Sequence, residues 1–469
     1  MKILFASAEI FPFAKSGGLA DISYALPKAM RELADVTTLM PLYRFIDKER
    51  YGIRPTGEHF TLRFGGTGYD VELFKGGWEA EEAVFVYNPL LCDRDHLYGP
   101  PGEGYEDNDL RFAIFCHAIV ETARRYAFTL LHLNDWHTAP AALLARDAGL
   151  RAKSVFTIHN LAYQGIFPPE SLKRTGIAQR HFCMEELEFF GQVNWMKGGI
   201  AHADAVTTVS PSYAVEIQEP EYGCGLDGFL RKHNRKLKGI LNGIDTEVFN
   251  PSSDAALPEN YDEKSLEGKD ICKRRFLGEI NIDKYEYPLF VFIGRFVEQK
   301  GIDLLIDTIE EAAKRPIVLA LLGDGSESVK HAVEEAVRSK ETLYCRFGYD
   351  EAFSHRMYAA ADFLLMPSRF EPCGLNQMIA MRYGTIPLVH GVGGLRDTVH
   401  KIEPSQRICG QGFVFTQMKP ASLLAAMDDA VKLYHDKNAF KRVRAFDMRC
   451  DFSVKRCAKE YLKLYEGLV

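Results

Sequence analysis

The sequence lacks the marks of several large protein classes. It has no uninterrupted apolar run near the length of about 18 residues that a membrane-spanning helix needs, so we expect no membrane span. Its 10 cysteines are scattered, with no Cys-x-x-Cys pair and no histidine or cysteine partner at the spacing of a zinc site. We therefore expect neither a metal site nor a disulfide framework, and the reducing cytoplasm is the expected location.

Basic residues are outnumbered by acidic ones, and no targeting signal is expected. The 57 lysines and arginines are outnumbered by 64 aspartates and glutamates, and no long basic tract offsets this balance. A nucleic-acid partner is therefore not expected, and any anionic ligand must be held by local cations. Glu9 interrupts the first apolar run and no small-residue cleavage site follows it, so we expect no secretory signal.

Two common phosphate-binding fingerprints are missing. The sequence contains neither the dinucleotide-binding pattern Gly-x-Gly-x-x-Gly nor a phosphate loop that ends in Gly-Lys-Ser/Thr. A nicotinamide-dependent oxidoreductase is accordingly a remote alternative.

The chain does contain material for two α/β domains. Its 469 residues, 46% of them hydrophobic, exceed one ordinary core, so two domains of roughly 200 residues each are expected. Short β-branched runs alternate with helical patterns, which is typical of βα units. The strands expected in the first half are Lys2–Ala6, Val36–Met40, Ala83–Tyr87, Leu130–Asn134, Ser154–His159 and Ala205–Val209, with a hairpin over 59–77.

A second series of strands begins at "YPLFVFIGRF" and continues through "IVLALLGDG", "TLYCRFGY", "DFLLMPS" and "TIPLVHG". We predict Rossmann-like domains over 1–241 and 242–450, and a C-terminal helix within 451–469 that packs back on the first domain. The predicted fold class is α/β, with two doubly wound, mostly parallel sheets that face a deep cleft. Sheets of this kind bind ligands at the carboxyl ends of their strands.

The segment "FAKSGGLAD", residues 13–21, follows the first expected strand and precedes a helical pattern. Gly17 and Gly18 would let backbone N–H groups point toward an anion at a helix N-terminus, and Lys15 would add a full positive charge. The alternative is a solvated lysine on an ordinary tight turn.

A second cationic pair occurs in "IGRFVEQKG", where Arg295 ends a predicted strand and Lys300 precedes a predicted helix. The planar fork of arginine and the point charge of lysine together suit a diphosphate. The alternative is that both residues are surface charges.

A carboxylate precedes the predicted helix in "SRFEPCGLNQMIAMRYG", residues 368–384. Glu371 could accept hydrogen bonds from sugar hydroxyls, and the N–H groups of Cys373, Gly374 and Leu375 could bind an anion or a hydroxyl. The alternatives are a helix-capping role for Glu371 and a packing role for Cys373 as a small buried residue.

Polar residues also follow two strands of the first half, in "LHLNDWHTAP" and "FTIHNLAYQGIF". Asp135, Trp136, His159 and Asn160 are therefore candidate site residues. A strand-end aspartate is alternatively a helix N-cap, and a single histidine is alternatively a hydrogen-bonded core residue.

Several motifs stand in a fixed order along the chain: "KSGGLAD", "NDWHTA", "TIHNLAYQG", "VNWMKGGIAHAD", "LNGIDTEVFNP", "GRFVEQKG", "GYDEAFSHRMYAAADF" and "EPCGLNQMIAMRYGTIPLV". In this order they resemble bacterial glycogen synthases and plant starch synthases, from about residue 1 to residue 450. The resemblance implies the glycosyltransferase B fold and a reaction without metal or cofactor. Glucose would pass from a sugar nucleotide, usually ADP-glucose, to the non-reducing end of an α-1,4-glucan such as glycogen or a malto-oligosaccharide, with retention of configuration.

The resemblance also implies residue roles, with the acceptor side on the first domain and the donor side on the second. The catalytic positions would be Lys15, Arg295 and Lys300 at the diphosphate, and His159 and Glu371 at the donor glucose. The substrate-binding positions would be Gly17, Gly18, Asp21, Asp135, Trp136, Asn160, Asn242, Tyr349, Cys373, Gly374, Leu375 and Asn376. The family usually has a small hydroxyl residue where this chain has Asn376, so UDP-glucose stays open as the donor.

Retention by double displacement needs a carboxylate nucleophile near the anomeric carbon, and the motifs offer none. Attack on the same face as departure, with the leaving phosphate taking the acceptor's proton, is therefore favoured. Two alternatives stand beside this function: another retaining glucosyltransferase of the same fold, and a non-catalytic glucan-binding protein. The Lys-x-Gly-Gly at residues 15–18 argues against the first, and cations aimed at a leaving group argue against the second.

Overall fold

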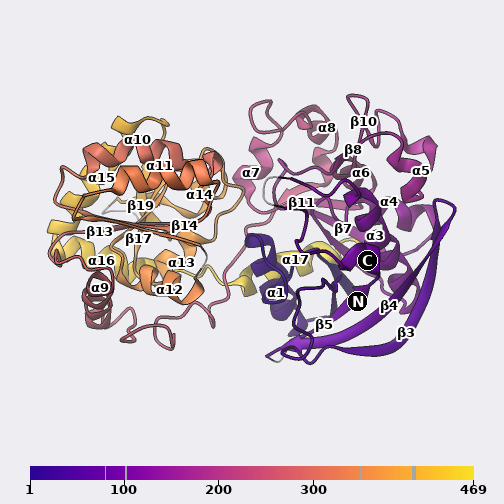
Figure 1. Cartoon of the computed structure of the whole chain (residues 1–469), viewed down its shortest axis with the longest axis horizontal. Helices are drawn as coiled ribbons and strands as arrows, with labels where there is room; N and C mark the ends of the chain where they lie inside the picture. Colours follow the sequence, from indigo (N-terminus) through magenta and orange to yellow (C-terminus); the bar gives the residue numbers. More distant parts are fainter. Residues whose placement is uncertain (80, 101–102, 349, 404–407) are drawn as a thin grey trace. The chain divides into compact units, whose positions relative to one another are not determined.

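The computed structural model describes residues 1–79, 81–100, 103–348, 350–403 and 408–469 (Figure 1). Its internal contacts divide the chain into two compact units. The first unit comprises Met1–Asn242 and Val454–Val469, and the second comprises Gly243–Ser453. Within the described ranges, no helix is long and apolar enough to cross a membrane.

The first unit is built on a nine-stranded sheet with the order β12-β11-β7-β6-β1-β2-β5-β4-β3. Pairing is parallel from β12 to β5 and antiparallel from β5 through β4 to β3. The strands are β1 (Lys2–Ala6), β2 (Asp35–Pro41), β3 (Arg54–Phe64), β4 (Thr67–Trp78), β5 (Glu81–Tyr87), β6 (Leu130–Asn134), β7 (Lys153–Ile158), β11 (Ala205–Thr208) and β12 (Leu237–Gly239). A small antiparallel sheet joins β8 (Ile166–Phe167), β10 (Gln192–Asn194) and β9 (Glu188–Phe189).

The helices of this unit include one from the end of the chain, α17, which packs on α1. The hydroxyl of Tyr465 lies 2.5 Å from Nδ1 of His132, and the hydroxyl of Tyr461 lies 3.2 Å from Oγ1 of Thr207. These contacts join α17 to β6 and β11. The helices are α1 (Gly18–Arg31), α2 (Pro89–Cys92), α3 (Asn108–Arg125), α4 (Pro140–Asp147), α5 (Ser171–Thr175), η1 (Gln179–His181), α6 (Trp195–His202), α7 (Pro211–Glu216), α8 (Asp227–Lys232), η2 (Asn234–Lys236) and α17 (Val454–Glu466).

The second unit has a seven-stranded parallel sheet with the order β15-β14-β13-β16-β17-β19-β18. Its strands are β13 (Leu289–Ile293), β14 (Val318–Gly323), β15 (Leu343–Phe347), β16 (Phe363–Met366), β17 (Ile386–His390), β18 (His400–Lys401) and β19 (Gln411–Phe415). Its helices are α9 (Glu267–Glu279), η3 (Glu298–Lys300), α10 (Ile302–Ala312), α11 (Glu327–Val337), α12 (Glu351–Ala360), α13 (Asn376–Arg382), α14 (Gly393–Thr398), α15 (Pro420–His435) and α16 (Lys437–Asp447). Helices α10, α11 and α15 cover one face of this sheet, and α9, α12 and α13 cover the other (Figure 1).

The apolar pattern explains this layering. Every residue of β14 is buried, as expected for a central strand with helices on both faces. On α10, Ile302, Leu305 and Ile309 enter the core, while Glu310 is exposed. The predicted α/β class with two doubly wound sheets is confirmed, and β1 and β6 begin and end at the predicted residues.

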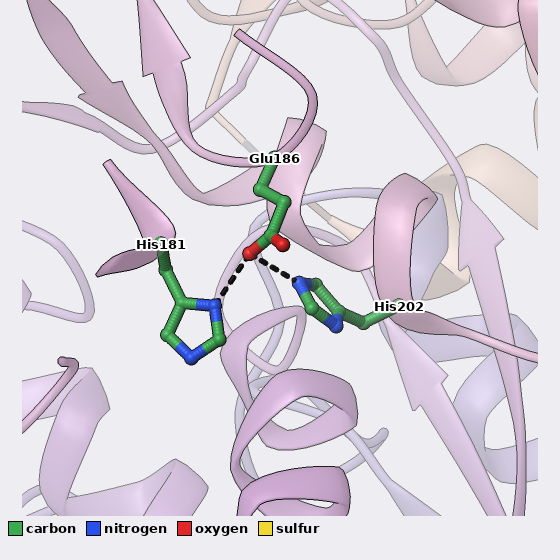
Figure 2. Close-up of side chains that lie close together, drawn as sticks. All are labelled: His181, Glu186 and His202. Carbon is green, nitrogen blue, oxygen red and sulfur yellow. Dashed lines mark hydrogen bonds and ion pairs between the residues drawn. The ribbon is translucent and has the colours of Figure 1, made fainter. Parts of the chain in front are cut away.

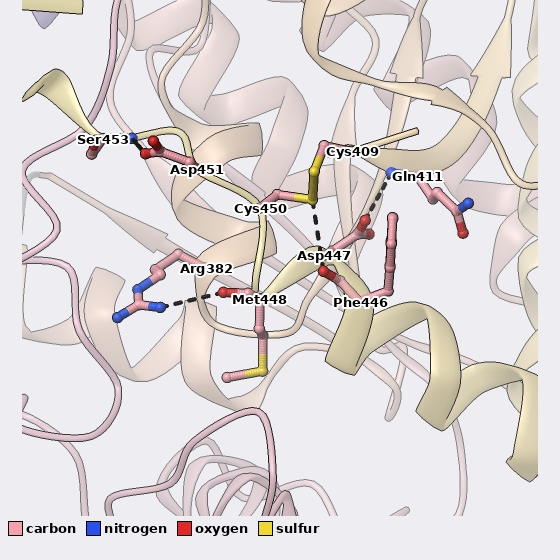
Figure 3. The surroundings of a disulfide bond; sticks show 9 residues. All are labelled: Arg382, Cys409, Gln411, Phe446, Asp447, Met448, Cys450, Asp451 and Ser453. Carbon is pink, nitrogen blue, oxygen red and sulfur yellow. Dashed lines mark hydrogen bonds between the residues drawn. A yellow bond between two sulfur atoms is a disulfide. The ribbon is translucent and has the colours of Figure 1, made fainter. Parts of the chain in front are cut away.

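One expectation about the cysteines was wrong. Cys409, just before β19, forms a disulfide with Cys450, just after α16 (Figure 3). The backbone N–H of Gln411 also donates to Oδ1 of Asp447 at 2.8 Å, which joins the same two segments. The two cysteines are 41 residues apart in the sequence, so only tertiary packing reveals the pair.

Candidate active site

Each large sheet has a central place where the direction in which successive parallel strands are added reverses. In the first sheet it lies between β1 and β6, and in the second it lies between β13 and β16. Ligands of open α/β sheets bind at such places, outside the carboxyl ends of the strands. The loops that follow these strands are therefore where site residues are expected.

The loop after β1 presents Lys15 beside an acidic partner. Nζ of Lys15 lies 2.6 Å from Oδ1 of Asp21, which stands in the first turn of α1. Burial raises the pKa of Asp21, and the charge of Lys15 and its hydrogen bond oppose that rise. The two side chains are 25% and 27% exposed, so Lys15 is oriented but remains accessible to a ligand.

Glu9 fixes the shape of this loop. Its carboxylate accepts hydrogen bonds from the backbone N–H of Ser16, from Oγ of Ser16 at 2.6 Å and from the hydroxyl of Tyr98 at 2.6 Å. The residue is 3% exposed. At Gly17, an added Cβ would meet no atom within 4 Å, and α1 has no side-chain cap. The start of α1 therefore faces open space.

Asp135 follows β6 and organises the chain after β7. It has a left-handed φ of 56°, and its Oδ1 accepts from the backbone N–H groups of His159 at 2.7 Å and Asn160 at 3.4 Å. Asp135 is 8% exposed, and burial raises its pKa to about 7 although both N–H groups oppose the rise. Burial therefore moves the titration of this carboxyl group from the acid range toward neutral pH.

His159 is held in one tautomer by Asn134. The side-chain amide of Asn134 donates from Nδ2 to the carbonyl of Ala6 at 3.0 Å, so its Oδ1 faces Nε2 of His159 at 2.9 Å. Because an amide oxygen only accepts, Nε2 carries the proton. Burial lowers the pKa of His159 to about 3. The ring is thus neutral at physiological pH, with a lone pair on Nδ1.

Trp136 and Asn160 each contact neighbouring parts of the first unit. Gly165 lies against the indole of Trp136 so closely that an added Cβ would be 2.5 Å from Cε3, and Gly165 has a φ of 63°. The indole also packs edge-on against Phe112. Oδ1 of Asn160 accepts from the backbone N–H of Ala162 at 3.1 Å and so turns the chain after β7.

Asn242 ends the first unit with an unsatisfied group. Its backbone N–H donates to the carbonyl of Val209 at 3.2 Å, while its Oδ1 is buried and receives no hydrogen bond from the part of the chain that the structure describes. A buried acceptor without a donor costs free energy. A ligand hydroxyl could supply the missing donor.

In the second unit, the loops after β13 and β16 meet in an ion pair. Nζ of Lys300 lies 2.6 Å from Oε2 of Glu371, and Oγ of Ser368 donates to the same oxygen at 3.0 Å. Glu371 is 5% exposed. No hydrogen bond from the described residues reaches Oε1, so this oxygen can accept from a ligand.

Gly301 makes the ion pair possible. It has a φ of 70°, and an added Cβ would lie 1.9 Å from the carbonyl oxygen of Pro367, so only glycine allows this approach of the two loops. Arg295 lies between β13 and η3. Its side chain is exposed and makes no hydrogen bond or ion pair to any described residue.

The segment after Glu371 is held by Gln377. Nε2 of Gln377 donates to the carbonyls of Cys373 at 3.0 Å and Gly374 at 2.9 Å, and Gly374 has a φ of 73°. Cys373 is 4% exposed, and an added Cβ at Gly394 would lie 2.3 Å from its carbonyl oxygen. Cys373 is therefore buried and closely packed, and contact of this residue with a ligand stays a prediction.

Asn376 connects the two sides of the reversal point in the second sheet. It is the first residue of α13, and its Nδ2 donates to the carbonyl of Ile293, at the end of β13, at 2.6 Å. Leu375, the N-cap, makes no side-chain capping bond. The amide nitrogen of Asn376 thus serves the structure, and contact of this residue with a nucleotide stays a prediction.

Most of the predicted residues follow the expected strands in each unit, but Asn242 follows β12, where no strand was predicted. Tyr349 lies outside the described residues. The sequence reasoning missed Glu9, Asn134 and Ser368, which orient the predicted residues. The sequence marks these three residues in the same way as the predicted ones: each is a polar side chain near the carboxyl end of an apolar strand.

Comparison with known proteins covers nearly the whole chain. Residues 2–232 match the model of the starch synthase catalytic domain, and residues 277–443 match that of glycosyl transferases group 1. The chain is 42% identical to a glycogen synthase of Aquifex aeolicus over 474 residues, which cover 99% of both proteins. It is also 42% identical to glycogen synthase 1 of Methylococcus capsulatus, over 99% of this chain and 96% of that protein.

A solved structure agrees with these relatives. The catalytic domain of starch synthase IV from Arabidopsis thaliana, solved with ADP and acarbose, superposes with a TM-score of 0.93 at 32% identity and covers 99% of both chains. The chain therefore belongs to the family of bacterial glycogen synthases and plant starch synthases, and it is a glycosyltransferase with the function of a glycogen synthase.

Proposed function

We propose that the enzyme transfers glucose from ADP-glucose to the non-reducing end of an α-1,4-glucan, either glycogen or a malto-oligosaccharide, with retention of configuration. The observation that carries this proposal is the pair of Lys300 and buried Glu371 at the reversal point of the second sheet. The relative solved with ADP supports an adenine nucleotide. UDP-glucose is the second candidate donor because Asn376 replaces the usual small hydroxyl residue.

Three cations are proposed to bind the diphosphate of the donor: Lys15, Arg295 and Lys300. Negative charge grows on the departing nucleotide as the glycosidic bond breaks, so fixed cations stabilise the transition state more than the ground state. Lys15 and Lys300 are each oriented by a carboxylate, and the exposed guanidinium of Arg295 can bind a phosphate with two parallel N–H donors. In this proposal these side chains take the part of a metal ion.

The donor glucose is proposed to contact Glu371 and His159. Oε1 of Glu371 would accept from a sugar hydroxyl, and the N–H groups of Gly374 and Leu375 would donate to another. Positive charge grows at the anomeric carbon, and a protonated imidazole would oppose it. The low pKa of His159 keeps the ring neutral, and its Nδ1 can accept a hydrogen bond from a hydroxyl.

The remaining predicted positions are proposed to line the glucose or acceptor side of the site. Asn242 has the best support, because its buried Oδ1 lacks a donor among the described residues. The others are Gly17, Gly18, Asp21, Asp135, Trp136, Asn160, Tyr349, Cys373 and Asn376.

For the chemical step we propose attack on the face from which the nucleotide leaves. The bond from the anomeric carbon to the acceptor oxygen forms as the bond to the phosphate oxygen breaks, and that phosphate oxygen takes the acceptor's proton. A covalent intermediate would need a free carboxylate. Glu371 is engaged by Lys300, and Asp135 is buried and bonded to two backbone N–H groups, which supports the direct route.

We also propose a cytoplasmic location, which cell fractionation would test.

Kinetics of nucleotide release test these roles. The purified variants Lys15→Ala, Arg295→Ala and Glu371→Gln are each expected to lower kcat by about 100-fold or more. The matched control is Arg338→Ala, because Arg338 forms only an exposed ion pair with Glu335 on α11. Full activity in a folded Glu371→Gln variant would remove this residue from the site. The ratio of kcat/KM for ADP-glucose and UDP-glucose decides the donor, and a ratio below one would contradict the adenine assignment.

A further inference from the structure

A second cluster of reactive side chains lies in the first unit, away from the loops described above. It consists of His181 at the end of η1, Glu186 in the following loop and His202 at the end of α6, just before β11 (Figure 2). The residues of the candidate active site follow the carboxyl ends of strands, whereas this cluster precedes the amino end of β11. It is therefore separate from the transfer reaction.

Two ring nitrogens face one carboxylate oxygen in this cluster (Figure 2). Nε2 of His202 lies 3.0 Å from Oε2 of Glu186, and Nδ1 of His181 contacts the same oxygen. All three ligand atoms lie within 4.8 Å of one another. The side chains of His181, His202 and Glu186 are 7%, 13% and 28% exposed, so the cluster is largely shielded from water.

The hydrogen bonds of His181 leave a lone pair facing Glu186. Nε2 of His181 lies 2.9 Å from Oδ2 of Asp147, which can only accept, so Nε2 carries a proton. In a neutral ring Nδ1 is then an acceptor, and it points at a carboxylate oxygen that is also an acceptor. Two facing acceptors repel each other unless a cation, either a proton or a metal ion, lies between them.

We propose that His181, Glu186 and His202 bind a zinc ion. Two imidazoles and one carboxylate are a ligand set that zinc accepts, whereas calcium and magnesium prefer oxygen ligands alone. Asp147 supplies the outer contact that metal-binding histidines usually have, and Arg180 holds it at 2.7 Å. Water would complete the tetrahedron.

Binding of the ion requires the three ligand atoms to move, because His181 and Glu186 lie closer together than tetrahedral zinc ligands do and the three atoms lie only within 4.8 Å of one another. Ligand atoms of a tetrahedral zinc site with bonds of about 2.0 to 2.1 Å lie about 3.3 Å apart. The distance of 3.0 Å between His202 and Glu186 therefore has to open by a few tenths of an ångström. Glu186 is in a loop and partly exposed, so its side chain can make that movement.

The ion would have a structural role. Between β7 and α6 the chain runs through 159–194, where only short elements form: β8, α5, η1, β9 and β10. Zinc bound at this cluster would join that excursion to the end of α6 and, through Asp147, to the end of α4. Bound metal would thus stabilise the folded first unit.

A zinc titration of the whole chain tests the proposal. Because Cys224 is exposed and Cys183 is partly exposed, thiols are first alkylated, and metal is removed by chelation followed by buffer exchange. We expect about one Zn²⁺ per chain, and loss of this binding in His202→Gln and Glu186→Gln. Asp147→Asn keeps all three ligands and should weaken binding by about 10- to 100-fold. The matched control is His435→Gln, which removes an exposed histidine of α15 and should bind like the unmodified chain.

If the unmodified chain bound zinc no more tightly than His202→Gln does, the proposal would be overturned. The cluster would then be an ion pair between the histidines and Glu186 without metal. If the variants fail to fold, Co²⁺ added to the unmodified chain decides the question. A visible spectrum of tetrahedral cobalt with nitrogen and oxygen ligands is expected, and its absence contradicts the site. Glucosyl transfer by the folded, metal-free chain should persist, so failure of this proposal is distinguishable from failure of the proposed reaction.

Discussion

Replacement of Asp135 by asparagine should stabilise the first unit at high pH. Burial raises the pKa of Asp135 to about 7 in the folded chain, whereas an aspartate in an unfolded chain has a pKa of about 3.9. Between these values the folded state binds more protons than the unfolded state, so the free energy of unfolding falls as the pH rises. Asparagine removes this penalty, and its Oδ1 can still accept from the N–H groups of His159 and Asn160.

The magnitude follows from the two pKa values. A difference of about 3 units at 1.36 kcal/mol per unit gives a penalty of about 4 kcal/mol at pH 8 and about 1.5 kcal/mol at pH 5. Any cost of the added amide N–H groups is the same at both pH values. We therefore expect Asp135→Asn to be more favourable at pH 8 than at pH 5 by about 2 to 3 kcal/mol.

Urea unfolding followed by tryptophan fluorescence measures this difference. All 3 tryptophans of the chain, at positions 78, 136 and 195, lie in the first unit, so the signal reports that unit. The matched control is Asp47→Asn, because Oδ1 of Asp47 also accepts from two backbone N–H groups but the residue is exposed.

The result that would refute the reasoning is specific. If the change in free energy of unfolding for Asp135→Asn were the same at pH 5 and pH 8, Asp135 would not carry a raised pKa in the folded chain. A pH-dependent effect of equal size in Asp47→Asn would assign the dependence to the loss of any aspartate.

Three further predictions follow from single contacts. Gly301→Ala should lower kcat by at least tenfold, since its Cβ would displace Lys300 from Glu371, and steady-state kinetics with a circular dichroism check of the fold would show it. Cys450→Ser should lower the free energy of unfolding of the second unit by up to about 4 kcal/mol, because the bond closes a loop with a separation of 41 residues; urea titrations with and without reductant should show the loss only without it. The pH profile of kcat should have the same shape near pH 6 to 7 in the unmodified chain and in His159→Gln, because burial keeps the pKa of His159 at about 3. A step present in the unmodified chain and absent from His159→Gln would contradict the neutral ring.

Much of the fold, and the places where the candidate site residues lie on it, was predictable because local pattern and topology agree. Buried parallel strands are short apolar runs, as in β6 and β14, and they are visible in the sequence. Polar residues directly after such runs, such as Asp135 and His159, then fall at the carboxyl ends of strands, where open α/β sheets bind ligands. Motif order supplied the family, and the comparisons confirm it.

The remaining features depend on contacts between residues that are distant in the sequence. Lys300 and Glu371 are 71 positions apart, and their pairing needs the close approach at Gly301. The disulfide between Cys409 and Cys450 follows from the packing of α16 beside β19, which spacing does not encode. The raised pKa of Asp135 is set by burial, a property of the assembled unit.

Elongation of maltotetraose with ADP-glucose, followed by proton NMR of the product, tests the central claim most directly. The account predicts that ADP release requires the glucan and that each ADP released corresponds to one new α-1,4-linked glucose at the non-reducing end. A β-linked product, or ADP release without elongation of the glucan, would contradict it.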